Sequence, residues 1–303
     1  MEPSVAAPRT SITIPPIDFG VYQLRGEECT QACLTALGAG YRHIDTAQLY
    51  GNEADVGRAL QQTRLRREDI FLTTKIGRCE GGVEKAYRSA LRSVGRIAGE
   101  DGHVDLFLIH RPVEPRREIW LALEKLMAEG RTGAIGVSNF REERLEEMRG
   151  YASIWPPAVN QIEVHPWCQQ RRLVAYCQRN GIVVQAYSPL ARGQRMSDPV
   201  LARVVERVRR RLLLSGTGPE PGTGAGGAEA AEGREPARSV TTAQVLVRWS
   251  LQKGFVPLPK SSDPARIEAN FNVFWLELDG EEMELLDGLD MGSAGALFPA
   301  NVS

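Results

Sequence analysis

Short strand-like runs alternate with helix-like stretches eight times along this 303-residue chain. Each run is rich in apolar and β-branched residues and is bounded by turn-forming residues, as buried strands are. The runs cover residues 16–20, 42–46, 70–76, 104–110, 134–138, 158–164, 182–188 and 255–259. The clearest helix-like stretches cover residues 27–37, 83–95, 117–129, 142–149, 171–179 and 241–252. Strands that are each followed by a helix pair in parallel through right-handed crossovers.

The number of these units decides between two α/β architectures. Eight units in about 300 residues fit one closed (β/α)₈ barrel, the TIM barrel, better than two doubly wound sheets. We therefore expect residues 1–303 to fold as a single domain of this type. The first dozen residues and residues 280–303 fall outside the alternation and should form a plug, lid or tail.

One glycine-rich segment, residues 215–238, interrupts the alternation before the last βα unit. Ten of its 24 residues are Gly or Pro and it has no apolar periodicity, which predicts a flexible, low-complexity insertion. Residues 222–227 fit the pattern G-x-G-x-x-G. A dinucleotide site needs a strand before this pattern and a helix after it, and neither is present, so we attribute the match to composition.

Composition and charge exclude several classes of function. The 37 basic and 38 acidic residues leave a formal charge of -1, which argues against binding to nucleic acid or to an anionic membrane. No run of 18 apolar residues occurs, so we expect no membrane span. The five cysteines are scattered, and the four histidines lack zinc-site spacing. These features predict a cytoplasmic protein with free thiols and no metal.

In a (β/α)₈ barrel the reactive groups gather where the strands end. Polar residues at these ends are Tyr22, Asp45, Tyr50, Lys75, His110, Ser138, Asn139, Gln161, Tyr187, Ser188 and Lys260. A lysine and a histidine that end apolar runs are costly to bury without partners. Taken alone, however, Lys75 could form a structural ion pair and His110 could be a satisfied core histidine.

Four of these residues together fit one reaction. Tyr50 has an ordinary pKa of about 10 and could act as an acid near neutral pH if a cation stabilised its anion. Lys75 could be that cation, held and kept charged by Asp45, while His110 could donate a hydrogen bond to a carbonyl oxygen. The set has no nucleophile and no metal ligands, so a cofactor must supply the electrons.

At this point the motifs resemble a known family. The runs GYRHIDTAQLYGNE, TTKIG, DLFLIHRP, IGVSNF, NQIEVHPW, QAYSPL and PLPKSSDPARIEANF are similar, in this order, to the aldo-keto reductases. The resemblance covers residues 9–290 and is interrupted at the glycine-rich insertion. It implies a barrel that binds NADPH without a Rossmann domain and reduces aldehydes or ketones, as aldose and aldehyde reductases do. The enzyme would be of the NADP⁺-dependent alcohol dehydrogenase type.

The resemblance also implies roles for individual residues. The catalytic tetrad would be Asp45, Tyr50, Lys75 and His110. Hydride would come from nicotinamide C4 and the proton from Tyr50. The cofactor ligands would be Ser138, Asn139 and Gln161 at the carboxamide, Tyr187 stacked on the nicotinamide, Ser188 and Leu190 along the pyrophosphate, Lys260, Ser261, Ser262 and Arg266 at the 2'-phosphate and adenosine, and Asn270 at the adenine.

The residues near Lys260 support an anion site independently of the resemblance. Asp263 followed by Pro264 predicts the N-cap and first residue of a helix, so an anion would meet a helix N-terminus flanked by Lys260 and Arg266. A capped surface helix with solvated charges is the alternative. Ala269 stands where many family members place a glutamate that contacts adenine, and Glu268 would point elsewhere on the helix.

The expected substrate site consists of Tyr22, Tyr50, His110 and Arg111. Gly77 and Arg111 stand where many family members have tryptophans. Gly77 should widen the site, and Arg111 could bind a carboxylate or phosphate, or could turn to solvent. The chain beyond residue 292 is short, so we expect an open site with a broad substrate range.

One other departure lies in the first strand, and one rival function stays open. Asp18 replaces a glycine usual in the family, which puts the local backbone path in doubt.

The protein could be an NADPH-binding regulatory or interaction protein on the same barrel, a redox sensor like the potassium-channel β subunits. The enzyme hypothesis predicts a monomer whose partner is a small-molecule carbonyl compound.

Overall fold

All eight predicted strands are present in the computed structural model, which describes residues 5–6, 12–215 and 240–302. β7 begins at residue 132, before the predicted residue 134, and several other strands are shorter than the predicted runs. The strands are β3 (Phe19–Gly20), β4 (His43–Asp45), β5 (Phe71–Ile76), β6 (Val104–Ile109), β7 (Thr132–Ser138), β8 (Val159–Glu163), β9 (Val183–Tyr187) and β10 (Val256–Leu258).

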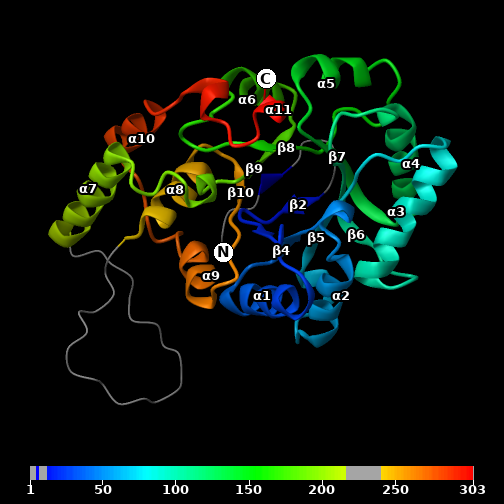
Figure 1. The fold of residues 1–303 in the computed structure, drawn as a ribbon, viewed down its shortest axis with the longest axis horizontal. Helices are drawn as coiled ribbons and strands as arrows, with labels where there is room; N and C mark the ends of the chain where they lie inside the picture. Colours follow the sequence, from blue (N-terminus) through cyan, green and yellow to red (C-terminus); the bar gives the residue numbers. More distant parts are fainter. Residues whose placement is uncertain (1–4, 7–11, 216–239, 303) are drawn as a thin grey trace.

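These strands form a nearly closed parallel barrel. Each strand pairs in parallel with the next in sequence, so the sheet order runs from β3 to β10 without interruption. Two backbone hydrogen bonds join its ends, from Asp18 N to Pro257 O at 3.0 Å and from Gly20 N to Pro259 O at 3.2 Å. The fold is therefore the predicted (β/α)₈ TIM barrel, with the helices around the strands (Figure 1).

Helices follow the strands in the predicted order, and all six stretches singled out from the sequence are helical. The α-helices are α1 (Gly26–Ala39), α2 (Glu53–Gln62), α3 (Gly82–Ala98), α4 (Arg116–Ala128), α5 (Glu142–Met148), α6 (Arg171–Arg179), α7 (Pro199–Ser215), α8 (Thr242–Gln252), α9 (Pro264–Phe271), α10 (Gly280–Asp287) and α11 (Pro299–Val302). Short 3₁₀ helices are η1 (Gln48–Tyr50), η2 (Arg67–Asp69), η3 (Ala191–Gly193) and η4 (Gly292–Gly295).

The N-terminal segment closes one end of the barrel. β1 (Val5–Ala6) and β2 (Thr13–Ile14) form a small antiparallel pair. Ile14 is fully buried against Leu106, Leu108 and Val256, which belong to the cluster inside the barrel. Apolar packing of this kind removes the barrel interior from water, so the segment acts as the plug that its position outside the alternation predicts.

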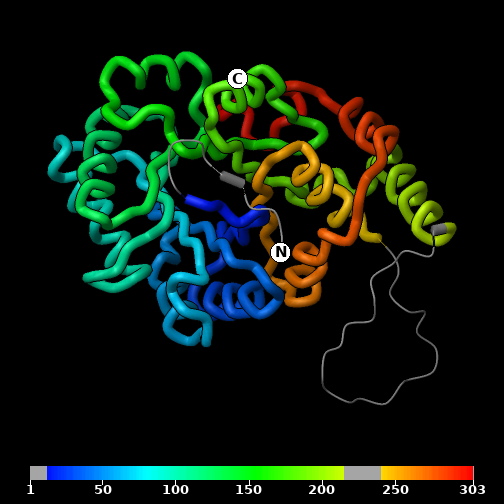
Figure 2. Tube along the Cα trace, turned by 180° about the vertical axis from the view of Figure 1, so that it is seen from behind, coloured from blue at the N-terminus to red at the C-terminus, as the bar shows by residue number. Residues whose placement is uncertain are grey.

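The C-terminal segment begins on the outside of the barrel. α10 lies beside α7, and Arg211 Nη2 of α7 contacts Glu282 Oε2 of α10 at 2.9 Å. Figures 1 and 2 show this pair at one edge of the molecule, from which the chain returns toward α6 and β8 and ends at α11. The expected tail therefore lies against the barrel.

Most of the predicted insertion lies outside the described residues, which resume at Val240. The helix before it and the chain after it are in contact, because Arg209 Nη2 donates to Val240 O at 2.8 Å. No helix among residues 5–6, 12–215 and 240–302 is long and apolar enough to cross a membrane.

Candidate active site

The structure brings the four residues of the predicted tetrad together. Asp45 ends β4, Lys75 lies in β5, Tyr50 belongs to η1 just after β4, and His110 directly follows β6. Because parallel strands run in one direction, these ends meet at one mouth of the barrel. The tetrad is therefore assembled by topology from segments far apart in sequence.

Lys75 is the centre of this cluster. Its side chain is fully buried, and its ammonium group donates to Asp45 Oδ1, to Thr46 O at 2.9 Å and to Tyr50 Oη at 3.4 Å. Burial lowers the pKa of Lys75, but its interactions with Asp45 and Tyr50 outweigh this effect and leave that pKa raised. The lysine therefore stays charged, and its three polar partners compensate for the loss of water.

Tyr50 presents its hydroxyl to Lys75 and its ring to two neighbours. The ring centroid lies 5.0 Å from that of Tyr22 and 5.5 Å from that of His110. Burial raises the pKa of Tyr50, and Lys75 lowers it by a smaller amount. The expected influence of Lys75 is thus present but does not outweigh burial, and the phenol carries its proton at neutral pH.

His110 is neutral over the physiological range. Burial, together with the positive charges of Lys75 and Arg111, lowers the pKa of His110 to about 3. Its Nδ1 is buried and has no hydrogen-bond partner among the described residues. A neutral imidazole beside the Tyr50 phenol can donate one hydrogen bond to an oxygen without adding a positive charge to the site.

The residues expected at the carboxamide form a network beside His110. Ser138 Oγ donates to Gln161 O at 2.8 Å, and Asn139 Nδ2 donates to Ser138 Oγ at 2.9 Å and to His110 O at 3.1 Å. Asn139 Oδ1 accepts from the Tyr187 hydroxyl at 2.9 Å. Asn139 has a φ of 62°, a conformation that asparagine tolerates better than most residues.

Gln161 also touches the tetrad, which the sequence reasoning missed. Its Nε2 donates to Asp45 Oδ2 at 2.8 Å and to Gln185 Oε1 at 2.9 Å. Its own Oε1 has no recorded partner among the described residues and is available to a ligand. The signal that could have revealed Gln185 is a polar residue inside the otherwise apolar β9.

The residues expected at the far end of the cofactor lie around the start of α9. Asp263 caps the helix by accepting from Arg266 N at 2.9 Å, and Pro264 is its first residue, as predicted. Lys260, Ser262 and Arg266 are exposed, whereas Ser261 and Asn270 are buried. Ser188, with a φ of 52°, and Leu190 lie between β9 and η3.

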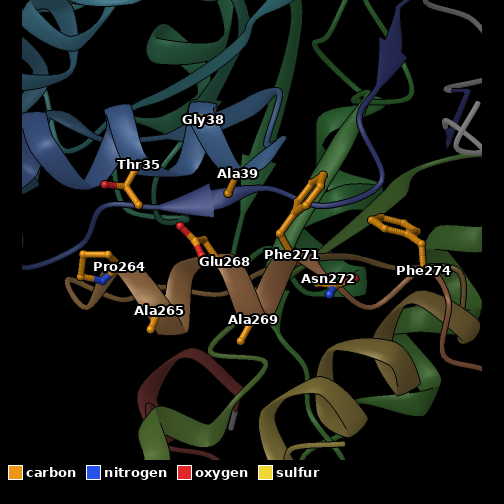
Figure 3. A pocket seen from close by; sticks show the side chains of 10 residues that line it. All are labelled: Thr35, Gly38, Ala39, Pro264, Ala265, Glu268, Ala269, Phe271, Asn272 and Phe274. Atoms are coloured by element: carbon orange, nitrogen blue, oxygen red, sulfur yellow. The ribbon is translucent and has the colours of Figure 1, made fainter. Parts of the chain in front are cut away.

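An open groove of about 980 Å³ lies on the outside of the barrel between α1 and α9 (Figure 3). Its lining includes Thr35, Pro264, Glu268 and Ala269 and none of the predicted site residues. Glu268 lies on the face toward α1, so it does point away from the position that Ala269 occupies. This groove is distinct from the mouth that holds the tetrad.

The substrate side of the mouth has an exposed apolar rim. Tyr22 is 44% exposed and Leu49 is 60% exposed. A Cβ atom added at Gly77 would lie 3.4 Å from the Leu49 side chain, so Leu49 fills part of the space that Gly77 leaves. Sequence reasoning missed Leu49, although an apolar residue directly before Tyr50 was a usable signal. Arg111 is exposed.

The C-terminal segment reaches this mouth on the side of Tyr187, while Tyr22 and Leu49 stay exposed. Phe298 makes a T-shaped contact with Tyr187 with ring centroids 5.9 Å apart, and Asn301 Nδ2 donates to the Tyr187 hydroxyl at 3.0 Å. The segment is short, but η4 and α11 return it across the barrel. Phe298 and Asn301 could not be placed from the sequence, because no periodicity fixes where a tail docks.

Comparison with known proteins shows the family of the chain. A model of the Aldo/keto reductase family matches residues 16–291, which include the whole tetrad. The chain belongs to the aldo/keto reductase family. An aldo-keto reductase of Mycolicibacterium vanbaalenii is 40% identical over 284 residues, which cover 93% of this chain and 90% of the relative. Morphine 6-dehydrogenase of Pseudomonas putida is 36% identical, covering 93% of this chain and 89% of the relative.

Solved structures agree with this assignment: an aldo/keto reductase of Brucella melitensis superposes with a TM-score of 0.80 at 35% identity, covering 95% of this chain and 99% of that one. A variant of Gox0644 in complex with NADPH superposes with a TM-score of 0.79 at 32% identity, covering 97% of this chain and 96% of that one. The family resemblance read from the motifs is therefore confirmed, and with it the barrel. The roles of individual residues stay predictions.

Proposed function

We propose that the protein is an NADPH-dependent oxidoreductase that reduces aldehydes and ketones to alcohols, with Tyr50 as the proton donor. The observation that carries this proposal is the buried ammonium group of Lys75, which joins Asp45 to the Tyr50 hydroxyl beside a neutral His110. An acid and a neutral donor aimed at one oxygen suit carbonyl reduction. The relatives support an oxidoreductase, since they include proteins named as aldo-keto reductases and a dehydrogenase.

The residues at the mouth fit NADPH, the cofactor that the aldo/keto reductase family uses. The unpartnered Oε1 of Gln161, with Ser138 and Asn139, would hold the carboxamide, and the Tyr187 ring would stack on the nicotinamide. Ser188 and Leu190 would lie along the pyrophosphate. Lys260, Ser261, Ser262 and Arg266 offer two cations and two hydroxyls to a 2'-phosphate at the start of α9, with Asn270 at the adenine. The bound cofactor supplies hydride from nicotinamide C4.

The chain's own residues act on the carbonyl oxygen. His110 donates a hydrogen bond that holds and polarises the oxygen, and Tyr50 transfers its proton there as negative charge develops. Lys75 then stabilises the phenolate that remains, at 3.4 Å from its oxygen. Asp45, itself bonded to Gln161, keeps Lys75 charged and in place.

The rim suggests the substrate class. Tyr22 and Leu49 present apolar surface next to Tyr50, which suits aromatic or aliphatic aldehydes and ketones. The exposed Arg111 beside His110 adds an attraction for acidic substrates. We therefore expect a broad range, an activity of the NADP⁺-dependent alcohol dehydrogenase type, and a cytoplasmic monomer.

An assay of NADPH oxidation with a panel of carbonyl compounds tests this function. The panel contains a nitrobenzaldehyde, a dicarbonyl, a simple ketone and an aldehyde that carries a carboxylate. We expect turnover of several members. Tight NADPH binding with no turnover of any member would instead favour the regulatory redox sensor, an alternative that nothing in the named relatives favours.

A further inference from the structure

The C-terminal strap, residues 297–302, is anchored by one buried carboxylate. Glu163, the last residue of β8, is fully buried. Its Oε1 accepts from Leu297 N at 2.5 Å and its Oε2 accepts from Phe298 N at 3.0 Å. His165 Nε2 lies 3.0 Å from Oε1. Two consecutive backbone N–H groups therefore bind the two oxygens of one carboxylate.

This anchor and the strap depend on each other. A buried carboxylate needs donors in place of water, and leaving one oxygen unsatisfied carries a large penalty. Among the described residues, Oε2 of Glu163 accepts only from Phe298. In return, the carboxylate fixes the strap at the residue that precedes α11. Its charge makes these hydrogen bonds stronger than bonds between neutral groups.

From this anchor, a chain of contacts leads to the predicted nicotinamide site. Phe298 makes a T-shaped contact with Tyr187, and its ring centroid lies 5.6 Å from the guanidinium carbon of Arg192. Asn301 donates to the Tyr187 hydroxyl, which in turn donates to Asn139 Oδ1. Asn139 Nδ2 then donates to the carbonyl of His110. Tyr187 is thus held by a ring contact with Phe298 and by both hydrogen bonds of its hydroxyl.

We propose that Glu163 is a positioning residue for carbonyl reduction. It fixes the strap so that Phe298 and Asn301 hold the Tyr187 ring, and through Asn139 the segment at His110, in the orientation that NADPH requires. This inference rests on the proposed function, because Tyr187 is the ring expected to stack on the nicotinamide. It adds residues of the last turn of the chain to the machinery of the site.

The substitution Glu163→Gln tests the anchor, because glutamine keeps the shape but loses the charge and one acceptor. We expect the Kd for NADPH, measured by fluorescence titration, to rise about tenfold and kcat to fall about tenfold. Glu124→Gln is the matched control. Glu124 Oε1 also accepts from two consecutive backbone N–H groups, Ser153 at 2.7 Å and Ile154 at 2.7 Å, in a loop before β8. Glu124→Gln should change the Kd for NADPH and kcat less than twofold, even if it lowers Tm as much as Glu163→Gln does.

Two further variants separate positioning from mere stability. Asn301→Ala, at a partly exposed position, should shift Kd and kcat in the same direction by a smaller factor. The double variant, Glu163→Gln with Asn301→Ala, should show the same Kd and kcat as Glu163→Gln alone, because both residues act on Tyr187 through the same strap. If Glu163→Gln does not fold, two separate variants replace it in the comparison. One is a chain that ends at residue 296, and the other is the full-length Asn301→Ala variant.

The outcomes distinguish this inference from the proposed function. A wild-type protein that binds no NADPH, or reduces no carbonyl compound, contradicts the proposed function. A wild-type enzyme whose Glu163→Gln variant matches Glu124→Gln in Kd and kcat, or whose double variant shows fully additive losses, overturns the positioning role alone. The same holds if the truncated chain and Asn301→Ala both bind and react as the wild type does.

Discussion

The buried ammonium group of Lys75 explains why four separated residues form one site. A solitary lysine inside a barrel would lose its proton or destabilise the fold. Asp45, Thr46 and Tyr50 supply acceptors on three sides, so the charge is retained where a phenol needs it. The sequence predicted the pairing with Asp45 and Tyr50, but not the backbone carbonyl of Thr46, because backbone acceptors carry no residue-specific signal.

The first prediction concerns the proton donor. Tyr50→Phe removes the hydroxyl and keeps the ring contacts with Tyr22 and His110. We expect carbonyl reduction to fall by at least about 10²- to 10⁴-fold, since that range is typical of a general acid. NADPH affinity, measured by fluorescence titration, should stay within about threefold of the wild-type value, because the phenol hydroxyl is not a cofactor ligand. Retained turnover would remove Tyr50 from the proton-transfer step.

The second prediction concerns the pH dependence of reduction. The pKa of His110 is lowered to about 3, and that of Tyr50 is raised above its ordinary value of 10. Reduction needs a neutral imidazole and a protonated phenol, so kcat/KM should be flat between about pH 5 and 9 and should fall only at higher pH. A change in kcat/KM near pH 6.5 that disappears in His110→Asn would contradict the conclusion that His110 is neutral over this range.

The third prediction concerns Asp18, whose role the sequence did not reveal. Its carboxyl is fully buried, 3.2 Å from His43 Nε2, and the regular pairing of Phe19 with Ile44 shows that the strand path is undisturbed. Burial raises the pKa of Asp18 far above its ordinary value. The folded state therefore holds a proton that the unfolded state releases, so this group lowers stability as pH rises above about 4.

Asp18→Asn removes this titration. We expect it to raise Tm, with a gain in stability that widens between pH 5 and pH 8 by up to about 1.4 kcal/mol per pH unit for as long as folded Asp18 keeps its proton. Asp69→Asn, at an exposed carboxyl whose pKa Arg66 lowers, is the control and should show no widening. A Tm difference that is constant with pH would mean that Asp18 is ionised in the folded protein.

At the scale of elements, the N-terminus of α9 could be predicted in detail. Asp263 and Pro264 are a strong local signal, and the structure confirms the cap. The strands and the order of helices were also predictable, because each depends on the pattern of a few neighbouring residues. The docking of the C-terminal strap was not, since it depends on Glu163 and Tyr187, which lie more than a hundred residues away.

The fourth prediction belongs to α9. Lys260→Ala should raise the Kd for NADPH by about tenfold or more and leave that for NADH nearly unchanged, because a charge-assisted contact to the 2'-phosphate is lost. Lys125→Ala, which removes an exposed lysine of α4, is the control. Both affinities can be measured by fluorescence titration. Equal weakening of NADPH and NADH would move the 2'-phosphate site elsewhere.

At the scale of the whole molecule, we propose that residues 1–303 form one domain and that the glycine-rich insertion is a flexible addition to it. The fifth prediction is that deletion of residues 216–233 leaves Tm, NADPH affinity and kcat essentially unchanged. The contact between Arg209 and Val240 keeps the two flanks together without it. Loss of NADPH binding in a deletion variant that still folds would give the insertion a part in the cofactor site.

The closure of the barrel has a consequence for how the chain folds. Only β10 completes the ring, through the hydrogen bonds that join its end to β3, so the strands furthest apart in sequence must find each other last. A chain that has emerged from the ribosome only as far as β9 is an open sheet with two unpaired edges, a form prone to aggregation. All residues between β9 and β10 must be synthesised before the ring can close, which prolongs that exposure.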